Sequence, residues 1–209
     1  METKTGTAVD SAVPVSVYCH CIRVSEVRYG KRVNGMDYVF ETARMKVRAF
    51  VPDDVQRLFA IHSEAGVKQW IPNESYADPE ETRQAVDFFA SCVLKGRLPY
   101  VLAVEWKETG ELIGDTGINE VEGNEGEVEI GYVIARRYSG MGLATELVHA
   151  MTQYAVSRFG IRVLYGRVMR GNQASVRVLE KNGYAFEREE LGAEDDPYGK
   201  GMLIYRKQC

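Results

Sequence analysis

The order of the predicted strands and helices constrains this chain more than any other feature. Three strand patterns follow one another between residues 100 and 134, joined by short turns at Thr109-Gly110 and Gly123-Asn124. Such turns join antiparallel neighbours, so these strands predict a meander. An amphipathic helix at 142–159 then precedes a strand at 161–169, and a strand–helix–strand passage requires a parallel pairing. We therefore expect an α/β (α+β) fold, with a mixed, mostly antiparallel, twisted sheet and helices on both faces.

Two segments before the meander extend the predicted sheet. Residues 14–24 alternate between apolar and other side chains, which predicts a strand. Asn34-Gly35 lies between alternating runs at 28–33 and 36–48. Asn-Gly is the strongest short hairpin signal, because both central positions of the turn need a positive φ. We therefore expect an extra N-terminal β-hairpin.

The hairpin suggests a division of the chain near residue 40. We assign residues 1–40 to an N-terminal tail and hairpin extension, and residues 41–209 to the main domain. An uncovered apolar sheet edge invites association. We therefore expect the hairpin to have an interface role, as in a homodimer; extension of the sheet edge and cover of a cleft are the alternatives.

Helices are predicted on both sides of the meander. Pro52-Asp53-Asp54 opens the first, and Asp78 is a suitable N-cap for the second, with Pro79 at its first position and Glu81 completing a capping box. After the long helix, which ends at Gly160, the chain closes with a helix at 175–182 and strands at 184–189 and 202–206.

The composition argues against several classes of function. The 26 basic and 30 acidic residues give a net charge of −4 at pH 7, whereas nucleic-acid-binding domains usually carry a basic surface. No apolar run approaches the ~20 residues that a membrane-spanning helix needs. Cys19 and Cys21 flank His20 without a second pair of ligands, so we expect no metal. The N-terminus lacks a signal-peptide pattern, and we expect a cytoplasmic protein without nucleic-acid or membrane partners.

A glycine-containing loop precedes the long helix and carries the first functional signal. The first turn of a helix has unpaired N–H groups and a partial positive charge. Gly140 and Gly142 remove the side chains that would block a ligand there. Together these features predict an anion cradle suited to a pyrophosphate. A tight turn without a ligand is the alternative, and the loop alone does not decide between them.

Two sequence blocks carry a second functional signal. The first is Glu-Ile-Gly-Tyr at 129–132 leading into Ser-Gly-Met-Gly-Leu-Ala-Thr-Glu at 139–146, and the second spans 172–184. Together they resemble the GNAT N-acetyltransferase superfamily, and within it the branch that acetylates ribosomal-protein N-termini. The family's usual acyl-CoA motif is Gln/Arg-x-x-Gly-x-Gly/Ala. Ser139 departs from it at the first position, and Arg137 begins a rival register. We prefer the Ser139 register because Ala-Thr-Glu then matches as well.

The resemblance implies acetyl-CoA as co-substrate and a division of labour among the residues. Strand residues at 132–134 would pair with the pantetheine amides, and N–H groups at 140–145 would hold the pyrophosphate. Asn172 and Ser175 would face the thioester end, with simple helix capping as their alternative. The expected cofactor-binding residues are Tyr132, Val133, Ile134, Gly140, Met141, Gly142, Leu143, Ala144, Thr145 and Asn172.

The implied reaction is attack of an amine on the acetyl thioester, and the amine must first lose its proton. At pH 7 this costs roughly 4–5 kcal/mol for a lysine-like amine and about 1–1.4 kcal/mol for an α-amine. Glu129 is the best candidate for the base, with Glu127 on the same strand face; both are otherwise solvated carboxylates. Many relatives place a Tyr acid where this chain has Leu179. Ser175 is the candidate to assist the leaving thiolate.

The acceptor is predicted to be a cationic amine, such as a basic peptide N-terminus or a polyamine. Ten carboxylates in two short segments would attract a cation into the cleft. They are Glu120, Glu122, Glu125, Glu127, Glu129, Glu189, Glu190, Glu194, Asp195 and Asp196. Two alternatives stay open: transfer of another acyl group such as succinyl, and a CoA-binding sensor or interaction module without turnover.

Overall fold

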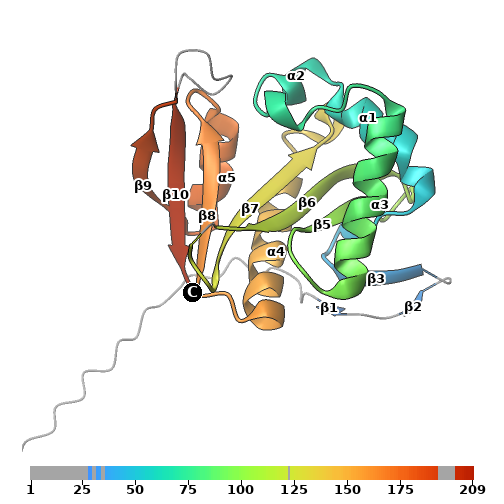
Figure 1. Cartoon of the computed structure of the whole chain (residues 1–209), viewed down its shortest axis with the longest axis horizontal. Coiled ribbons are helices and arrows are strands. Elements are labelled where there is room, and N and C mark those ends of the chain that lie inside the picture. Colours follow the sequence, from blue (N-terminus) through green and yellow to red (C-terminus); the bar gives the residue numbers. More distant parts are fainter. Residues whose placement is uncertain (1–27, 30–31, 34–35, 122, 193–200) are drawn as a thin grey trace, which may run out of the picture.

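A single mixed sheet organises the protein (Figure 1). The computed structural model describes residues 28–29, 32–33, 36–121, 123–192 and 201–209. The ten strands run in the order β1-β3-β4-β5-β6-β7-β8-β10-β9, and β2 pairs with β3. The strands are β1 (Arg28–Tyr29), β2 (Arg32–Val33), β3 (Met36–Glu41), β4 (Met45–Arg48), β5 (Tyr100–Trp106), β6 (Leu112–Glu120), β7 (Glu127–Ile134), β8 (Val163–Met169), β9 (Ala185–Glu190) and β10 (Met202–Gln208).

The pairing confirms the mixed sheet. The pair of β7 and β8 is parallel, and the other pairs are antiparallel. The meander of β5, β6 and β7 has the predicted order. Val33 pairs with Met36 in an antiparallel arrangement, which confirms the N-terminal hairpin. The predicted strand at 14–24 lies outside the described residues.

Helices cover both faces of the sheet, with α1 and α3 in front and α4 behind in the view of Figure 1. The α-helices are α1 (Val55–His62), α2 (Ala65–Lys68), α3 (Pro79–Lys95), α4 (Leu143–Phe159) and α5 (Gln173–Lys181). Short 3₁₀ turns are η1 (Pro52–Asp54), η2 (Pro72–Glu74) and η3 (Arg136–Tyr138). The core lies between these layers. Its fully buried side chains include Leu102, Ile113 and Ile118 from the sheet and Leu147 and Met151 from α4.

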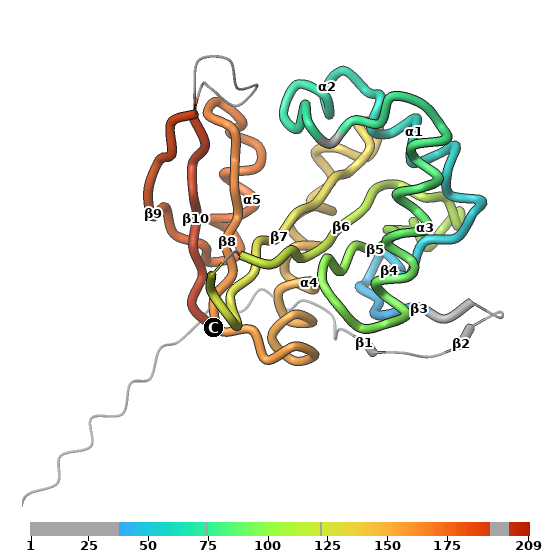
Figure 2. The backbone as a smooth tube through the Cα atoms, in the orientation of Figure 1, coloured from blue at the N-terminus to red at the C-terminus, as the bar shows by residue number. Residues whose placement is uncertain are grey.

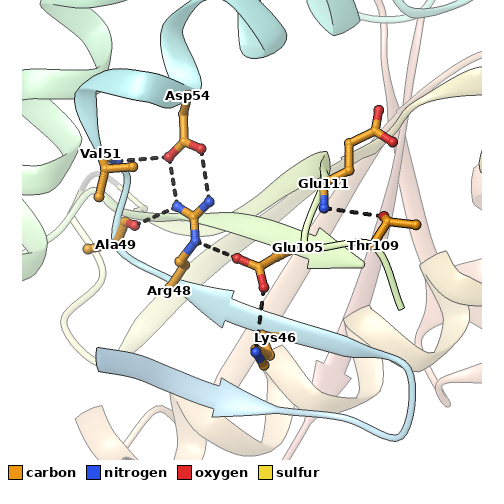
Figure 3. A network of polar contacts seen from close by, with 8 residues as sticks. All are labelled: Lys46, Arg48, Ala49, Val51, Asp54, Glu105, Thr109 and Glu111. Atoms are coloured by element: carbon orange, nitrogen blue, oxygen red, sulfur yellow. Dashed lines mark hydrogen bonds and ion pairs between the residues drawn. The ribbon is translucent and has the colours of Figure 1, made fainter. Parts of the chain in front are cut away.

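A buried ion-pair network fixes the start of α1 against the sheet (Figure 3). Arg48 on β4 donates from Nη1 to Asp54 at 2.7 Å and from Nε to Glu105 on β5 at 3.0 Å. Asp54 also accepts from the N–H of Val51 at 2.8 Å. Because removing one partner of a buried pair leaves an uncompensated charge, such networks hold their elements firmly in register. The network therefore positions α1, whose last residue lies at the cavity described below.

Two local expectations are corrected, and one short helix is added. The predicted run at 36–48 is two strands, because a turn closes where the N–H of Thr42 donates to the carbonyl of Met45. Asp78 caps α3 as expected, accepting from the N–H groups of Glu80 and Glu81. The side chain of Glu81, however, accepts from the N–H of Ala77, one residue before the cap, so the reciprocal capping box does not form. Helix α2 was not predicted, since its four residues are too few to show a periodicity.

The division at residue 40 falls within β3, which pairs with β4 of the main sheet. The hairpin strand therefore belongs to the same sheet as the rest of the fold. The division itself stays a prediction.

Strands β7 and β8 separate after a short parallel contact. They pair from Glu127–Val163 to Glu129–Tyr165, and no further pair joins them along their described residues. Figure 2 shows the two chain traces diverging toward the end of the molecule where α2 lies. Sheet continuity is lost there, so the backbone of the second half of β7 borders an opening.

Candidate active site

A cavity of about 400 Å³ occupies the opening between the separated strands. It is lined from β6 and β7 by Asp115 and Gly131, from β8 by Arg167, and from α5 by Ser175 and Leu179. Aromatic side chains from the α1–α3 side complete the wall. Residues from the middle strands, from the α1–α3 side and from α5 therefore converge on one cavity, as in most small-molecule sites.

The pairing of β6 with β7 determines which backbone groups of β7 face the opening. The N–H of Ala135 donates to the carbonyl of Ile113 at 2.8 Å. Alternate residues of an antiparallel strand direct both polar groups at the same neighbour. Val133 therefore directs its N–H and C=O at β6, like Ala135. Tyr132 and Ile134 direct theirs toward the side that β8 has left, where they are available to a bound chain.

The loop after β7 ends in two glycines with left-handed backbones. Gly140 and Gly142 both have φ of 78°, a conformation that glycine adopts without steric cost. Gly142 is the N-cap of α4, and no side chain caps that helix end among the described residues. A Cβ on Gly140 would meet no atom within 4 Å. Within the described residues, the first-turn N–H groups of α4 thus have no side-chain cap, and a Cβ on Gly142 would lie 3.7 Å from Arg44 Nη2.

The other loop residues have distinct surroundings. Leu143 is 1% exposed and anchors the helix start in the core, whereas Met141 is 45% exposed. Ala144 and Thr145 are half-buried in the first turn. The carbonyl of Thr145 accepts from Asn182 Nδ2 at 3.2 Å, which ties α4 to the end of α5.

An ion pair between Arg44 and Glu146 holds the loop between β7 and α4 in place. Arg44, just before β4, donates from Nη1 to the carbonyl of Met141 at 2.8 Å and from Nε to Glu146 at 2.8 Å. Burial tends to raise the pKa of Glu146, but hydrogen bonds from Thr42 and Arg44 outweigh it and lower that pKa. Glu146 is therefore ionised and directed at Arg44, which leaves the helix N–H groups to a ligand.

Asn172 and Ser175 lie together at the start of α5. Asn172 is the N-cap, and its Oδ1 accepts from the N–H of Ser175 at 3.2 Å. Asn172 therefore has the capping role that the sequence offered as an alternative. Both residues also line the cavity. The Ser175 hydroxyl has no hydrogen-bond partner among the described residues, so it is available to a group in the cavity.

Tyr132 and Leu179 fill the side of the cavity near α5. The Tyr132 hydroxyl donates to the carbonyl of Ser175 at 3.4 Å. Burial raises the pKa of Tyr132 to about 12, although that hydrogen bond lowers it somewhat. Leu179 is 1% exposed and packs on Gly166, where a Cβ would come within 2.6 Å of its Cδ1. Leu179 thus joins α5 to β8 and offers no proton.

Glu129 and Glu127 have different partners although they share a strand. Glu127 accepts a hydrogen bond from Tyr165 at 3.0 Å. Glu129 lines the cavity, is about one-third exposed, and lies 3.9 Å from Arg167 Nε. Of the two, Glu129 is the one placed for chemistry. It is four residues from Val133, which corresponds to about 13 Å along an extended strand.

The acidic residues expected to attract a cation are partly paired. Glu189 is bonded to Arg170, and Glu190 to Arg167 and Arg188. Glu122, Glu194, Asp195 and Asp196 lie outside the described residues. The described part of the two segments therefore holds less unpaired negative charge than the sequence suggests.

Sequence reasoning missed two residues of the cavity, His62 and Asp115. His62 Nε2 lies 2.8 Å from Asp115 Oδ2. The available signal was Asp115 itself, a charge within the otherwise apolar and small run Leu-Ile-Gly-Asp-Thr-Gly-Ile at 112–118. Its partner is 53 residues earlier, so no local pattern joins them.

Two properties of the described residues concern metal binding and membrane insertion. No group of three or more His, Cys, Asp or Glu side chains is placed to hold a metal ion there. Within the same residues, none of the helices has the length and apolar character needed to cross a membrane.

Comparison with known proteins identifies the family. A family model described as an acetyltransferase (GNAT) domain matches residues 44–185. The uncharacterised N-acetyltransferase p20 of Bacillus licheniformis is 27% identical over 163 residues, covering 78% of this chain and 89% of p20. Among solved structures, ribosomal-protein-S5-alanine acetyltransferase from Vibrio fischeri has a TM-score of 0.70 at 18% identity, covering 81% of this chain and 95% of that one. Spermidine N-acetyltransferase from Vibrio cholerae, in complex with CoA and spermine, has a TM-score of 0.68 at 16% identity, covering 80% and 96%.

The chain therefore belongs to the GNAT family of acetyltransferases. It is an acyltransferase enzyme. The resemblance drawn from the two motif blocks is confirmed, and so is the mixed fold that it implied.

Proposed function

We propose that this enzyme transfers an acetyl group from acetyl-CoA to a primary amine. The observation that carries the proposal is the continuous track formed by the outward backbone groups of β7 and the uncapped start of α4 beyond Gly142. It borders a cavity large enough for an acceptor. One surface thus offers hydrogen bonds to an extended chain, donors to an anion and space for a second molecule.

This geometry supports an assignment of the donor-binding residues. Tyr132 and Ile134 bond the pantetheine amides as an added strand would, and Val133 between them faces β6 and shapes the cavity wall. The N–H groups from Gly140 to Thr145 hold the pyrophosphate. Asn172 caps α5 and so presents Ser175 to the thioester end. Acetyl-CoA supplies the activated acetyl group as its thioester.

Side chains of the protein accept the proton of the amine and stabilise the leaving group. The attacking nitrogen forms a bond to the acetyl carbon, the C–S bond breaks, and CoA leaves as the thiolate. Glu129 takes the proton that the nitrogen loses; the strand spacing of about 13 Å from Val133 requires water in the cavity to carry it. Ser175 stabilises the thiolate by donating a hydrogen bond. No tyrosine acid is needed at Leu179, because a thiol with a pKa near 8.5 is a tolerable leaving group.

The acceptor is proposed to be a protein N-terminus or a small cationic amine. Structural relatives include enzymes named for each: a ribosomal-protein-S5-alanine acetyltransferase and a spermidine N-acetyltransferase. Both acceptors present a primary amine. The described carboxylate Glu129 lines the cavity, in keeping with a cation.

A direct assay tests the function. Purified enzyme is incubated with acetyl-CoA and a panel of benzylamine, spermidine and peptides with a free N-terminal Ser or Ala, and released thiol is measured. We expect thiol release that depends on one class of amine, together with binding of CoA by calorimetry. Binding without release for any amine would favour a CoA sensor. Faster release with succinyl-CoA than with acetyl-CoA would favour another acyl group.

A further inference from the structure

His62 and Asp115 form a hydrogen-bonded pair in the cavity wall, apart from the residues assigned above. His62 ends α1 and is 3% exposed. Its Nε2 lies 2.8 Å from Asp115 Oδ2 on β6. The Tyr76 ring packs against the imidazole, with 5.1 Å between ring centroids. Because the imidazole is almost fully buried and bonded to Oδ2, it holds the Asp115 carboxylate in one orientation.

Asp115 has acceptor capacity that the rest of the fold does not use. Its side chain is 13% exposed and lines the cavity. Among the residues that the structure describes, His62 is its one hydrogen-bond partner, through Oδ2. A carboxylate offers about four acceptor positions, and a largely buried carboxylate is stable only when its oxygens find donors. Oδ1 is therefore placed to accept from a group in the cavity.

The register of the sheet puts Asp115 beside the reacting end of the donor. Asp115 pairs directly with Val133, and paired residues on antiparallel strands have Cα atoms about 4.5–5.5 Å apart. Tyr132 and Ile134, which flank Val133, carry the outward backbone groups assigned to pantetheine. A nitrogen bound to Asp115 would thus lie next to the thioester.

The neighbouring surface leaves room for the rest of an amine. Gly117 and Gly131 form the next pair on this face, and a Cβ on Gly131 would meet no atom within 4 Å. Trp70, Tyr76 and Phe89 also line the cavity. Aromatic rings beside a carboxylate bind amines through their carbon frame and their positive charge. Glu129, by contrast, lies four residues away along β7 and 3.9 Å from Arg167.

We infer that Asp115 binds the amino group of the acceptor and that His62 positions Asp115 for this role. The inference rests on the proposed function, since it assigns the acceptor end of the same site. Asp115 accepts a hydrogen bond from the attacking nitrogen, directing its lone pair at the acetyl carbon. The aromatic side of the cavity holds the carbon frame next to the amine. The substrate class is a primary amine on an apolar or flat carbon frame.

Steady-state kinetics of Asp115→Asn test the inference, with the amine of the panel that gives the fastest thiol release. We expect KM for this amine to rise about 10- to 100-fold, the loss for one hydrogen bond to a charged group. KM for acetyl-CoA and the calorimetric affinity for CoA should stay within about twofold. Asp53→Asn, an exposed carboxylate in η1, is the matched control and should change neither constant. An unaltered acceptor KM in Asp115→Asn would overturn the assignment.

The positioning role of His62 needs its own readout. His62→Ala should raise the acceptor KM, and His62→Gln, which keeps an N–H donor, should restore part of the loss. In the Asp115→Asn background, His62→Ala should add nothing further, because the two residues act as one unit. Additive effects of the two substitutions on the acceptor KM would contradict a role of His62 that acts through Asp115.

A steric variant covers the case in which Asp115→Asn fails to fold. Gly131→Ala adds a methyl group into open space on the same face, so it should melt like the parent and raise the acceptor KM. An unchanged KM there would also overturn the inference. Failure of the parent to bind CoA or to acetylate any amine would instead refute the proposed function.

Discussion

The two sides of the opening are built in different ways. On the donor side, one continuous stretch from β7 to the first turn of α4 supplies backbone groups, and glycines keep it clear of side chains. On the acceptor side, side chains come from α1, α3, β6, β8 and the first half of β7, which are far apart in the chain. The first side suits the proposed donor, acetyl-CoA, whichever amine is the acceptor. The second suits an acceptor that particular side chains recognise.

This difference predicts that one half tolerates substitution where the other does not. A backbone cradle depends on φ at two glycines and is indifferent to most neighbouring side chains. A side-chain site depends on the identity of each residue, such as His62 and Asp115. Changes on the donor side should therefore alter acetyl-CoA affinity for every acceptor, whereas changes on the acceptor side should separate one amine from another.

The largest expected effect is on the acceptor side, at Glu129. Glu129→Gln should lower kcat about 100-fold, within the usual range for removal of a general base. The loss should be greatest at mildly acidic pH, where the amine most needs deprotonation. The affinity for CoA should be unchanged, as measured by calorimetry. Glu108→Gln, an exposed carboxylate in the turn after β5, is the matched control. Parallel pH–rate profiles in mutant and parent would show that Glu129 has only a structural role.

The next largest effect is on the donor side, at Gly142. Gly142→Val should weaken CoA binding about 10- to 100-fold, because a branched side chain would stand where the phosphates bind and would strain φ at 78°. Gly160→Val is the matched control, since Gly160 ends the same helix with φ of 66°. Both variants should lose thermal stability, but only Gly142→Val should lose CoA affinity. Equal affinities in the two variants would move the pyrophosphate away from this loop.

Sequence reasoning succeeded where the determinants are local. Asn34-Gly35 predicts a hairpin because both residues tolerate a positive φ, and the Val33–Met36 pair confirms it. The start of α4 follows from Gly142 and the long apolar stripe behind it. The parallel pair of β7 and β8 follows from the intervening helix. The donor side of the site is composed of these same local features, so its geometry was predictable.

The features that the sequence does not predict depend on contacts between distant segments of the chain. The His62–Asp115 pair spans 53 residues, and neither residue shows its partner in the sequence. The early separation of β7 from β8 is also invisible there, because both strands stay apolar enough to remain in a sheet. The sequence also does not show which carboxylates of the acidic segments are paired. Arginines at 167, 170 and 188 pair with two of them.

The smallest expected effect concerns Tyr132, which belongs to both sides. Its backbone faces the donor track, and its hydroxyl reaches the carbonyl of Ser175 at 3.4 Å, a weak contact for an O–H donor. Burial raises its pKa to about 12, from about 10 in an unfolded chain. The folded state thus holds the proton more tightly, so the stability from this residue is complete below pH 10 and is lost as pH rises toward 12.

Tyr132→Phe removes this proton linkage without removing the ring. The free energy of unfolding should fall less steeply with pH between 10 and 12 than in the parent, by up to about 1.4 kcal/mol per pH unit. Tyr184→Phe should act in the same direction, because burial also raises the pKa of Tyr184. Urea unfolding at a series of alkaline pH values measures both. Equal slopes in Tyr132→Phe and parent would mean that the ring is hydrated, and the wall between the donor track and α5 would then have to be more open than the packing of Leu179 on Gly166 implies.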